Sequence, residues 1–139
     1  MTTLTDDVRA LFDAANYAAL ATLLPDGSPH AVTVWAGVED DRLFFFTQPQ
    51  SRKARNIARD ARVALTVHDR SNPYRTAWVR GRVVATREGE EALRGIDALS
   101  RKYTGADFPM RSGVVYLVEP ERTGTMVLPF THEPETADS

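Results

Sequence analysis

The sequence predicts a mainly β protein in which short strands form a β-barrel with flanking helices. Apolar segments of strand length recur between turn residues, and helical periodicities occur only between pairs of strands. This order differs from the regular strand–helix–strand alternation of a Rossmann fold, and no glycine-rich phosphate loop of the GxGxxG or GxxxxGK(S/T) type occurs. We therefore expect a barrel rather than a doubly wound parallel sheet.

The first half of the chain predicts a helix, a hairpin and a third strand. Thr5 is a good N-cap, and Val8, Leu11 and Phe12 give the residues behind it an apolar stripe. The strands expected after this helix span residues 17–24, 29–38 and 42–47. Pro25–Ser28 predicts the turn between the first two, because proline presets φ and glycine supplies a positive φ.

The second half predicts further strands and one long helix within a single domain, residues 1–130. The expected strands span residues 62–68, 75–86, 114–118 and 122–128. Gly81 indicates a bulge or a close backbone approach inside the long strand. Leu93, Ile96 and Leu99 predict a helix over 87–103. Residues 131–139 are acidic and contain proline, so we expect a flexible tail.

Composition excludes several classes of protein. The chain has 139 residues and no cysteine, which excludes disulfides and thiolate catalysis. Its three histidines lack metal-ligand spacing, so we expect no metal site. No apolar run is long enough to span a bilayer, and the acidic N-terminus is unlike a signal peptide, which favours a cytoplasmic protein. A net charge of −2 argues against general nucleic-acid binding.

The segment Phe44–Asp60 carries the clearest functional signal. An aromatic strand leads to Ser51, a good N-cap, and a helix with an apolar face follows. Arg52 and Lys53 lie in the first helical turn, where the helix dipole disfavours cations by about 0.3–1 kcal/mol each. Such a helix start is a suitable phosphate site. A solvated basic helix is the alternative interpretation.

The same segment resembles the flavin-binding split β-barrel superfamily, which includes pyridoxamine 5'-phosphate oxidases and reductases that use the deazaflavin coenzyme F420. The resemblance rests on Phe44–Thr47 followed by Ser51–Lys53, and it covers roughly residues 5–128. The segments 72–75 (NPYR) and 99–105 (LSRKYTG) resemble the deazaflavin-dependent branch. In the FMN oxidases an arginine and a lysine occupy two strand positions that here are Val32 and Gly37.

The resemblance implies a split β-barrel that binds coenzyme F420 and transfers a hydride between the deazaflavin and a small organic substrate. It also implies a homodimer with cofactor sites between the subunits. The residues expected at the cofactor are Val34, Trp35, Thr47, Ser51, Arg52, Lys53, Asn56, Tyr74 and Arg75. The sequence identifies no catalytic side chain, and hydride transfer requires none because the cofactor carries that chemistry.

Two other functions stay open at this stage. The same phosphate site would serve an FMN-binding protein similar to pyridoxamine phosphate oxidase. A non-enzymatic barrel that binds flavin or haem is the second alternative. The visible absorbance of the cofactor would distinguish all three.

Overall fold

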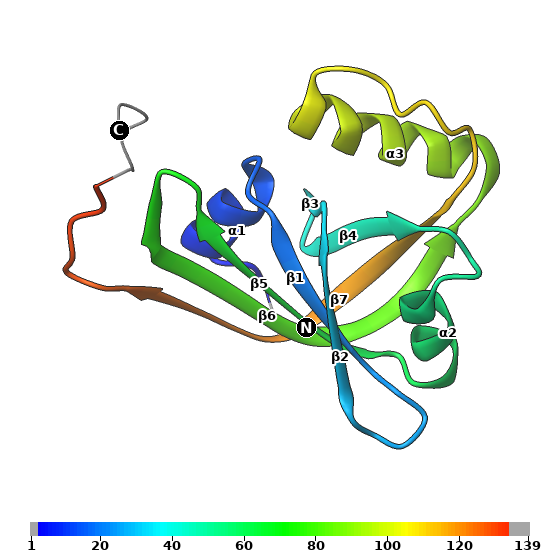
Figure 1. The fold of residues 1–139 in the computed structure, drawn as a ribbon, viewed down its shortest axis with the longest axis horizontal. Coiled ribbons are helices and arrows are strands. Elements are labelled where there is room, and N and C mark those ends of the chain that lie inside the picture. Colours follow the sequence, from blue (N-terminus) through cyan, green and yellow to red (C-terminus); the bar gives the residue numbers. More distant parts are fainter. Residues whose placement is uncertain (1–2, 134–139) are drawn as a thin grey trace, which may run out of the picture.

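The structure is a computed structural model that describes residues 3–133, and its main feature is one seven-stranded antiparallel sheet. The strands are β1 (Ala18–Leu23), β2 (Pro29–Val34), β3 (Gly37–Glu39), β4 (Arg42–Thr47), β5 (Arg62–Asp69), β6 (Asn72–Arg87) and β7 (Val114–Val127). The helices are α1 (Asp6–Asp13), α2 (Arg52–Arg59) and α3 (Gly89–Thr104). The predicted mainly β fold with flanking helices is confirmed (Figure 1).

The strand order β2-β1-β5-β6-β7-β4-β3 shows how the sheet closes. Strands β2 and β3 lie at opposite edges, yet only Trp35 and Ala36 separate them in the chain. The two edges must therefore meet at these residues, which curls the sheet into a barrel. The described residues contain no ladder between β2 and β3, so the barrel is split at this place. We call Trp35–Ala36 the seam.

The predicted strand 29–38 is therefore wrong as a single element, because the chain changes sheet edge inside it. The two predicted strands at 114–118 and 122–128 are one continuous strand, β7. Pro120 fits inside β7 because it pairs with Gly81 across a register shift, where a Cβ on Gly81 would lie 2.1 Å from the carbonyl oxygen of Glu119. The close backbone approach predicted at Gly81 is thereby confirmed.

Strand β6 begins at Asn72, three residues before the predicted start. The carboxylate of Asp69 accepts a hydrogen bond from the amide of Ser71, and the Asn72 side chain accepts one from the amide of Tyr74. These local bonds make a tight β5–β6 turn from residues that lie between the two predicted strands, 62–68 and 75–86. Figure 1 shows β6 and β7 running from beneath α3 to the opposite end of the molecule.

The barrel interior holds the main hydrophobic core. Helix α1, capped by Thr5, inserts its apolar stripe at one side, where Val8 and Phe12 are at most 1% exposed. The other fully buried core side chains include Leu20, Leu43, Phe45, Leu65, Val79 and Val118. Burying each such side chain stabilises the fold by about 1.5–3 kcal/mol. A smaller cluster of Ala92, Ile96 and Val115 lies under α3.

Two predictions concern the ends of the chain and its relation to membranes. The predicted tail, residues 131–139, lies mostly outside the described residues, which end at 133. Within residues 3–133, no helix has the length and apolar character needed to cross a bilayer.

Candidate functional site

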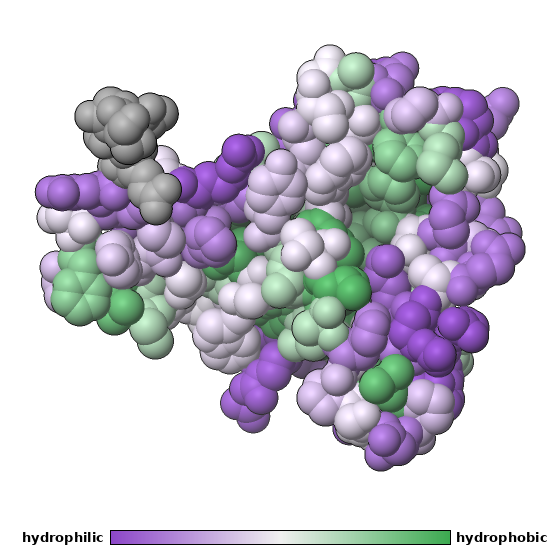
Figure 2. All heavy atoms as spheres, viewed as in Figure 1, coloured by the Kyte–Doolittle hydropathy of each residue, from purple (hydrophilic) through white to green (hydrophobic). Residues whose placement is uncertain are grey.

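A cavity of about 320 Å³ opens at the seam, and we call it the seam cavity. Its lining residues come from the position before β1, from β2, the seam, β4 and α2, and from the loop after α3: Tyr17, Thr33, Val34, Trp35, Phe46, Lys53 and Phe108. Figure 2 shows an apolar recess beneath α3 with polar side chains around it. One cation and several aromatic rings line this cavity, which suits an anionic ligand with an aromatic body.

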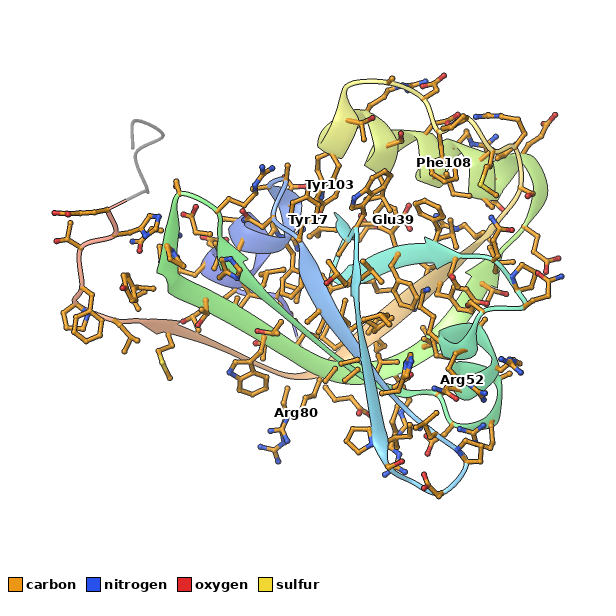
Figure 3. The ribbon with its side chains drawn as sticks, in the orientation of Figure 1. Tyr17, Glu39, Arg52, Arg80, Tyr103 and Phe108 are labelled. Atoms are coloured by element: carbon orange, nitrogen blue, oxygen red, sulfur yellow. The ribbon has the colours of Figure 1, made fainter. Side chains whose placement is uncertain are left out.

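The aromatic rings of the seam cavity contact one another. Trp35 stacks on Tyr103 with ring centroids 5.4 Å apart and an angle of 7° between the planes. Phe108 meets Phe46 edge-on at 5.0 Å and Trp35 edge-on at 6.1 Å. Figure 3 shows Tyr103 at the end of α3, with Tyr17 beside it. These contacts give the cavity a rigid aromatic side.

The start of α2 forms the polar side of the cavity. The Ser51 hydroxyl accepts a hydrogen bond from the amide of Ala54 at 3.2 Å, and the Thr47 hydroxyl donates to Ser51 at 3.0 Å. Arg52 is exposed, whereas Lys53 is half-buried in the cavity lining. No carboxylate occupies the first turn of α2, and no ion pair among the described residues includes Lys53.

Burial lowers the pKa of Lys53, because removing water penalises the charged ammonium group. A cation in this position lacks a protein partner for its charge. It lies beside the helix N-terminus, which also favours an anion. The cations at the start of α2 therefore destabilise the helix by itself, but they would bind a phosphate group there.

Helix α3 fastens the seam from the other side. The Tyr103 hydroxyl accepts from the amide of Ala36 at 3.2 Å and donates to the carbonyl oxygen of Asn16. The Lys102 ammonium group donates to the carbonyl oxygens of Ala36 and Phe12. Within the described residues, no strand pairs with the backbone of Ala36. The Lys102 and Tyr103 side chains therefore bind the amide and carbonyl groups of Ala36, which a neighbouring strand would otherwise bind. Burial lowers the pKa of Lys102 to about 8.

The structure brings together most of the predicted cofactor residues. Val34, Trp35 and Lys53 line the seam cavity, and Thr47 and Ser51 lie at the start of α2 behind Lys53. Figure 3 shows Arg52 on α2, at the outer side of this region. These residues are adjacent because the chain passes directly from β4 into α2.

Three predicted residues point elsewhere in a single chain. Asn56 is 0% exposed, and its amide donates to the Thr22 hydroxyl at 3.0 Å inside the α2–β1 contact. The Tyr74 ring packs against Phe130 with centroids 5.2 Å apart, and Arg75 pairs with Asp69 at 3.3 Å. Both lie at the start of β6, at the end of the molecule opposite α2 (Figure 1).

Sequence reasoning missed four residues of the cavity: Tyr17, Thr33, Phe46 and Phe108. The clearest available signal was Phe108, which is the one large apolar residue of the sequence between Thr104 and Pro109. An aromatic residue in an otherwise polar loop often packs back onto the protein. Phe46 belonged to the aromatic run, but the sequence did not show which of its alternate residues face the barrel interior and which face α3.

Comparisons with known proteins agree with this architecture. The sequence model described as pyridoxamine 5'-phosphate oxidase matches residues 4–126. A solved structure named F420 reductase is 26% identical, with a TM-score of 0.77, and the match covers 87% of this chain and 98% of that chain. No curated protein sequence matches the chain.

Two further solved structures share the fold. A conserved hypothetical protein of Mycobacterium tuberculosis is 24% identical with a TM-score of 0.73, covering 98% of this chain and 95% of that chain. A candidate pyridoxamine 5'-phosphate oxidase of Listeria innocua is 20% identical with a TM-score of 0.67, covering 86% of this chain and 95% of that chain. Because the family's sequence model spans most of the chain, the protein belongs to the pyridoxamine 5'-phosphate oxidase family and to its flavin-binding split-barrel superfamily.

Proposed function

We propose that the protein is an oxidoreductase that binds coenzyme F420 in the seam cavity and transfers a hydride between the deazaflavin and a small organic substrate. The observation that carries the proposal is Lys53, a half-buried cation without a carboxylate partner beside the start of α2. The solved structure named F420 reductase, 26% identical over most of the chain, supports the choice of cofactor.

The donors around Lys53 fit a phosphate group. Ser51, Arg52 and Lys53 would bind the cofactor phosphate through charge-assisted hydrogen bonds, with the free amide groups of the first helical turn beside them. Thr47 orients the Ser51 hydroxyl through their hydrogen bond. Asn56 would act indirectly by fixing α2 against β1, since its side chain is engaged with Thr22.

The aromatic side of the cavity fits a planar ring. Val34 and Trp35 would contact the ring of the cofactor, which supplies the hydride chemistry when bound. The roles left to this chain are to hold the ring flat, to exclude water and to present one face to the substrate. The stacked Trp35–Tyr103 pair and the edge-on Phe108 make the cavity rigid enough for that task.

One feature of the segment that spans the seam favours F420 over FMN. The FMN oxidases that the chain resembles have two bases at the matching positions, whereas here those positions are Val32 in β2 and Gly37 in β3. At position 37 even a Cβ atom would lie 2.6 Å from the Phe44 ring, so a lysine there would require that ring to move. FMN would therefore have fewer cationic side chains to bind it in this protein than in those oxidases. The family's name keeps an FMN-dependent oxidase as the second candidate.

A homodimer is part of the proposal. The outer face of the sheet carries a hollow of about 540 Å³ lined mainly by small or apolar residues, including Ala19, Ala21, Ala31, Ala64 and Trp78. A neighbouring hollow shares Ala19 with this face and shares Tyr17 and Thr33 with the seam cavity. A second copy on this face would border the seam cavity. It would also allow Tyr74 and Arg75 to reach the partner's site, which one chain alone does not achieve.

Titration of the purified protein with F420 and with FMN, at low and at high salt, tests the choice of cofactor. We expect F420 to bind more tightly, with an advantage that shrinks as salt rises, because the acidic tail of F420 would be attracted to exposed bases such as Arg55 and Arg59. Tighter binding of FMN at every salt concentration would instead establish the oxidase alternative. Light scattering tests the dimer, and a 15.4 kDa particle at micromolar concentration would exclude it.

A further inference from the structure

Phe108 lies in the loop 105–113, and its backbone is held by one buried carboxylate. Asp97 of α3 is 8% exposed, and its Oδ1 atom accepts a hydrogen bond from the Phe108 amide at 3.1 Å. Arg111 donates to both carboxylate oxygens of Asp97, at 2.9 and 3.0 Å. The same guanidinium group donates to the Phe108 carbonyl oxygen at 2.9 Å. Both backbone polar groups of Phe108 are therefore bound by this pair.

The other bonds of the loop hold neighbouring residues rather than Phe108 itself: the Ser100 hydroxyl donates to the carbonyl oxygen of Ala106, Arg101 pairs with Asp107, and the Gln48 amide donates to the carbonyl oxygen of Ser112. Ala106, Asp107, Pro109 and Met110 are all exposed, whereas Phe108 is half-buried. The loop begins at Gly105 and ends at Gly113, both with positive φ, so its two ends are glycines with wide conformational freedom. Without the Asp97–Arg111 pair, packing of its own ring would have to hold Phe108 in place against its conformational entropy.

The position of the Phe108 ring shapes the seam cavity. Its ring contacts Trp35 and Phe46 edge-on, so the three aromatic rings together form one side of the cavity. The cavity volume of about 320 Å³ is small for a ligand site. We infer that Asp97 and Arg111 are positioning residues that hold Phe108 as the aromatic side of the seam cavity, and that this side selects a flat conjugated ring. The ligand class rests on the proposed function, whereas the positioning of Phe108 does not.

A second ion pair on the same loop provides a matched control. Arg101 of α3 pairs with Asp107, the residue before Phe108. Both side chains of that pair are more than half exposed, and neither makes a hydrogen bond to Phe108. Replacing Arg101 or Arg111 by methionine removes the same charge from the same region. Only Arg111→Met releases the backbone of Phe108.

The first measurement needs no cofactor. Trp35 and Trp78 are the only tryptophans of the sequence, so Trp78→Phe leaves Trp35 as the fluorescent reporter beside Phe108. In that background we expect Arg111→Met to increase acrylamide quenching of Trp35 about twofold, because the ring that shields it is released. Arg101→Met should leave quenching unchanged, and Arg111→Lys should restore part of the shielding. Unchanged quenching in Arg111→Met, or an equal increase in Arg101→Met, would overturn the inference.

The second measurement asks whether Arg111 acts through Phe108. Affinity for F420 and for FMN should fall about three- to tenfold in Arg111→Met and by a similar factor in Phe108→Leu. The double variant should lose no more than either single variant, because residues that act as one unit are non-additive. Additive losses would overturn the positioning role. If neither cofactor binds the unmodified protein, the proposed function fails, and the quenching measurement still decides the role of Arg111.

Discussion

Helix α2 lines the seam cavity through Lys53 and α3 packs against its wall through Tyr103, but the two helices arrange their charges in opposite ways. Helix α3 carries Glu90 and Glu91 in its first turn and Arg101 and Lys102 in its last turn, which is the order that the helix dipole favours. Helix α2 has no acidic residue in its first turn, where Arg52 and Lys53 lie instead. The charges of α3 therefore stabilise the helix, whereas those of α2 oppose its dipole.

This difference indicates that the first-turn residues of α2 serve ligand binding, whereas the polar residues at the end of α3 serve the stability of the fold. The polar side chains of α3 are engaged with the protein itself: Lys102 and Tyr103 with the seam, and Asp97 with Arg111. The first-turn cations of α2 have no carboxylate partner among the described residues. Substitutions in α2 should consequently alter ligand affinity more than stability, and substitutions in α3 should do the reverse.

The largest expected effect is on cofactor affinity. Lys53→Ala removes a charge-assisted hydrogen bond worth about 1.5–3 kcal/mol, so F420 should bind about ten- to a hundredfold more weakly. Arg59→Ala is the control at the other end of α2, where Arg59 contacts Leu23 and Asn56 of the protein. It should change affinity much less. Equal losses, measured by titration of cofactor fluorescence, would indicate a diffuse basic surface rather than a phosphate site.

The next effect is on stability and concerns α3. Tyr103→Phe keeps the ring that stacks on Trp35 but removes the hydroxyl that binds Ala36 and Asn16. Leaving these backbone groups unsatisfied should lower the free energy of unfolding by about 1–2 kcal/mol. Urea unfolding measures the loss, and Tyr17→Phe is the control because the Tyr17 side chain is exposed. A large loss of stability in Tyr17→Phe, with none in Tyr103→Phe, would contradict the structural role of α3.

A smaller effect of opposite sign is expected at the start of α2. Arg52→Gln relieves a cation at the positive end of the helix, so the cofactor-free protein should gain about 0.3–1 kcal/mol of stability. The same substitution should weaken F420 binding. Arg55→Gln, further along the helix, should change stability less than Arg52→Gln does, and any loss of F420 affinity that it causes should disappear at high salt. If the cofactor-free Arg52→Gln variant unfolds at a lower temperature than the unmodified protein, Arg52 stabilises the fold and the interpretation of the α2 charges is wrong.

The last effect is a dependence of stability on pH, and it is confined to alkaline solution. The pKa of Lys102 falls from 10.5 to about 8 in the folded protein, because burial disfavours the charged form. Between these values the unfolded chain binds more protons than the folded one, so the contribution of Lys102 to stability rises as pH increases through this window. The unfolding temperature of the unmodified protein should therefore improve relative to Lys102→Met between pH 8 and 10.5. Parallel curves for the two proteins would show that the Lys102 pKa is unshifted.

The sequence predicted local elements well where local chemistry decides them. Ser51 and Thr5 act as N-caps as expected, because capping depends on a few consecutive residues. The change of sheet edge at Trp35–Ala36 was not predictable, since an apolar run shows no difference between one long strand and two short ones at opposite edges.

The candidate site shows the same division. The phosphate side was predicted from the charges of one short segment. The aromatic side was largely missed, because Tyr17, Phe46 and Phe108 meet only through the closure of the barrel and the folding back of one loop. Asn56 has the residue type and spacing of a ligand-binding residue, but the turn of α2 that carries it faces β1. The spacing of residues along a helix shows which of them share a face. It does not show whether that face contacts a ligand or another part of the protein.

The missing ladder at the seam has a consequence for hydrogen exchange. Amides of β5 and β6 lie within continuous pairings in the middle of the sheet, so their exchange requires opening of most of the barrel. The edges β2 and β3 can separate from each other without breaking any strand pairing between them. Among the described residues, the hydrogen bonds that hold the Ala36 backbone come from the Lys102 and Tyr103 side chains. The amide of Ala36 should therefore exchange through a local opening that needs less free energy than the opening that exposes the amides of β5 and β6.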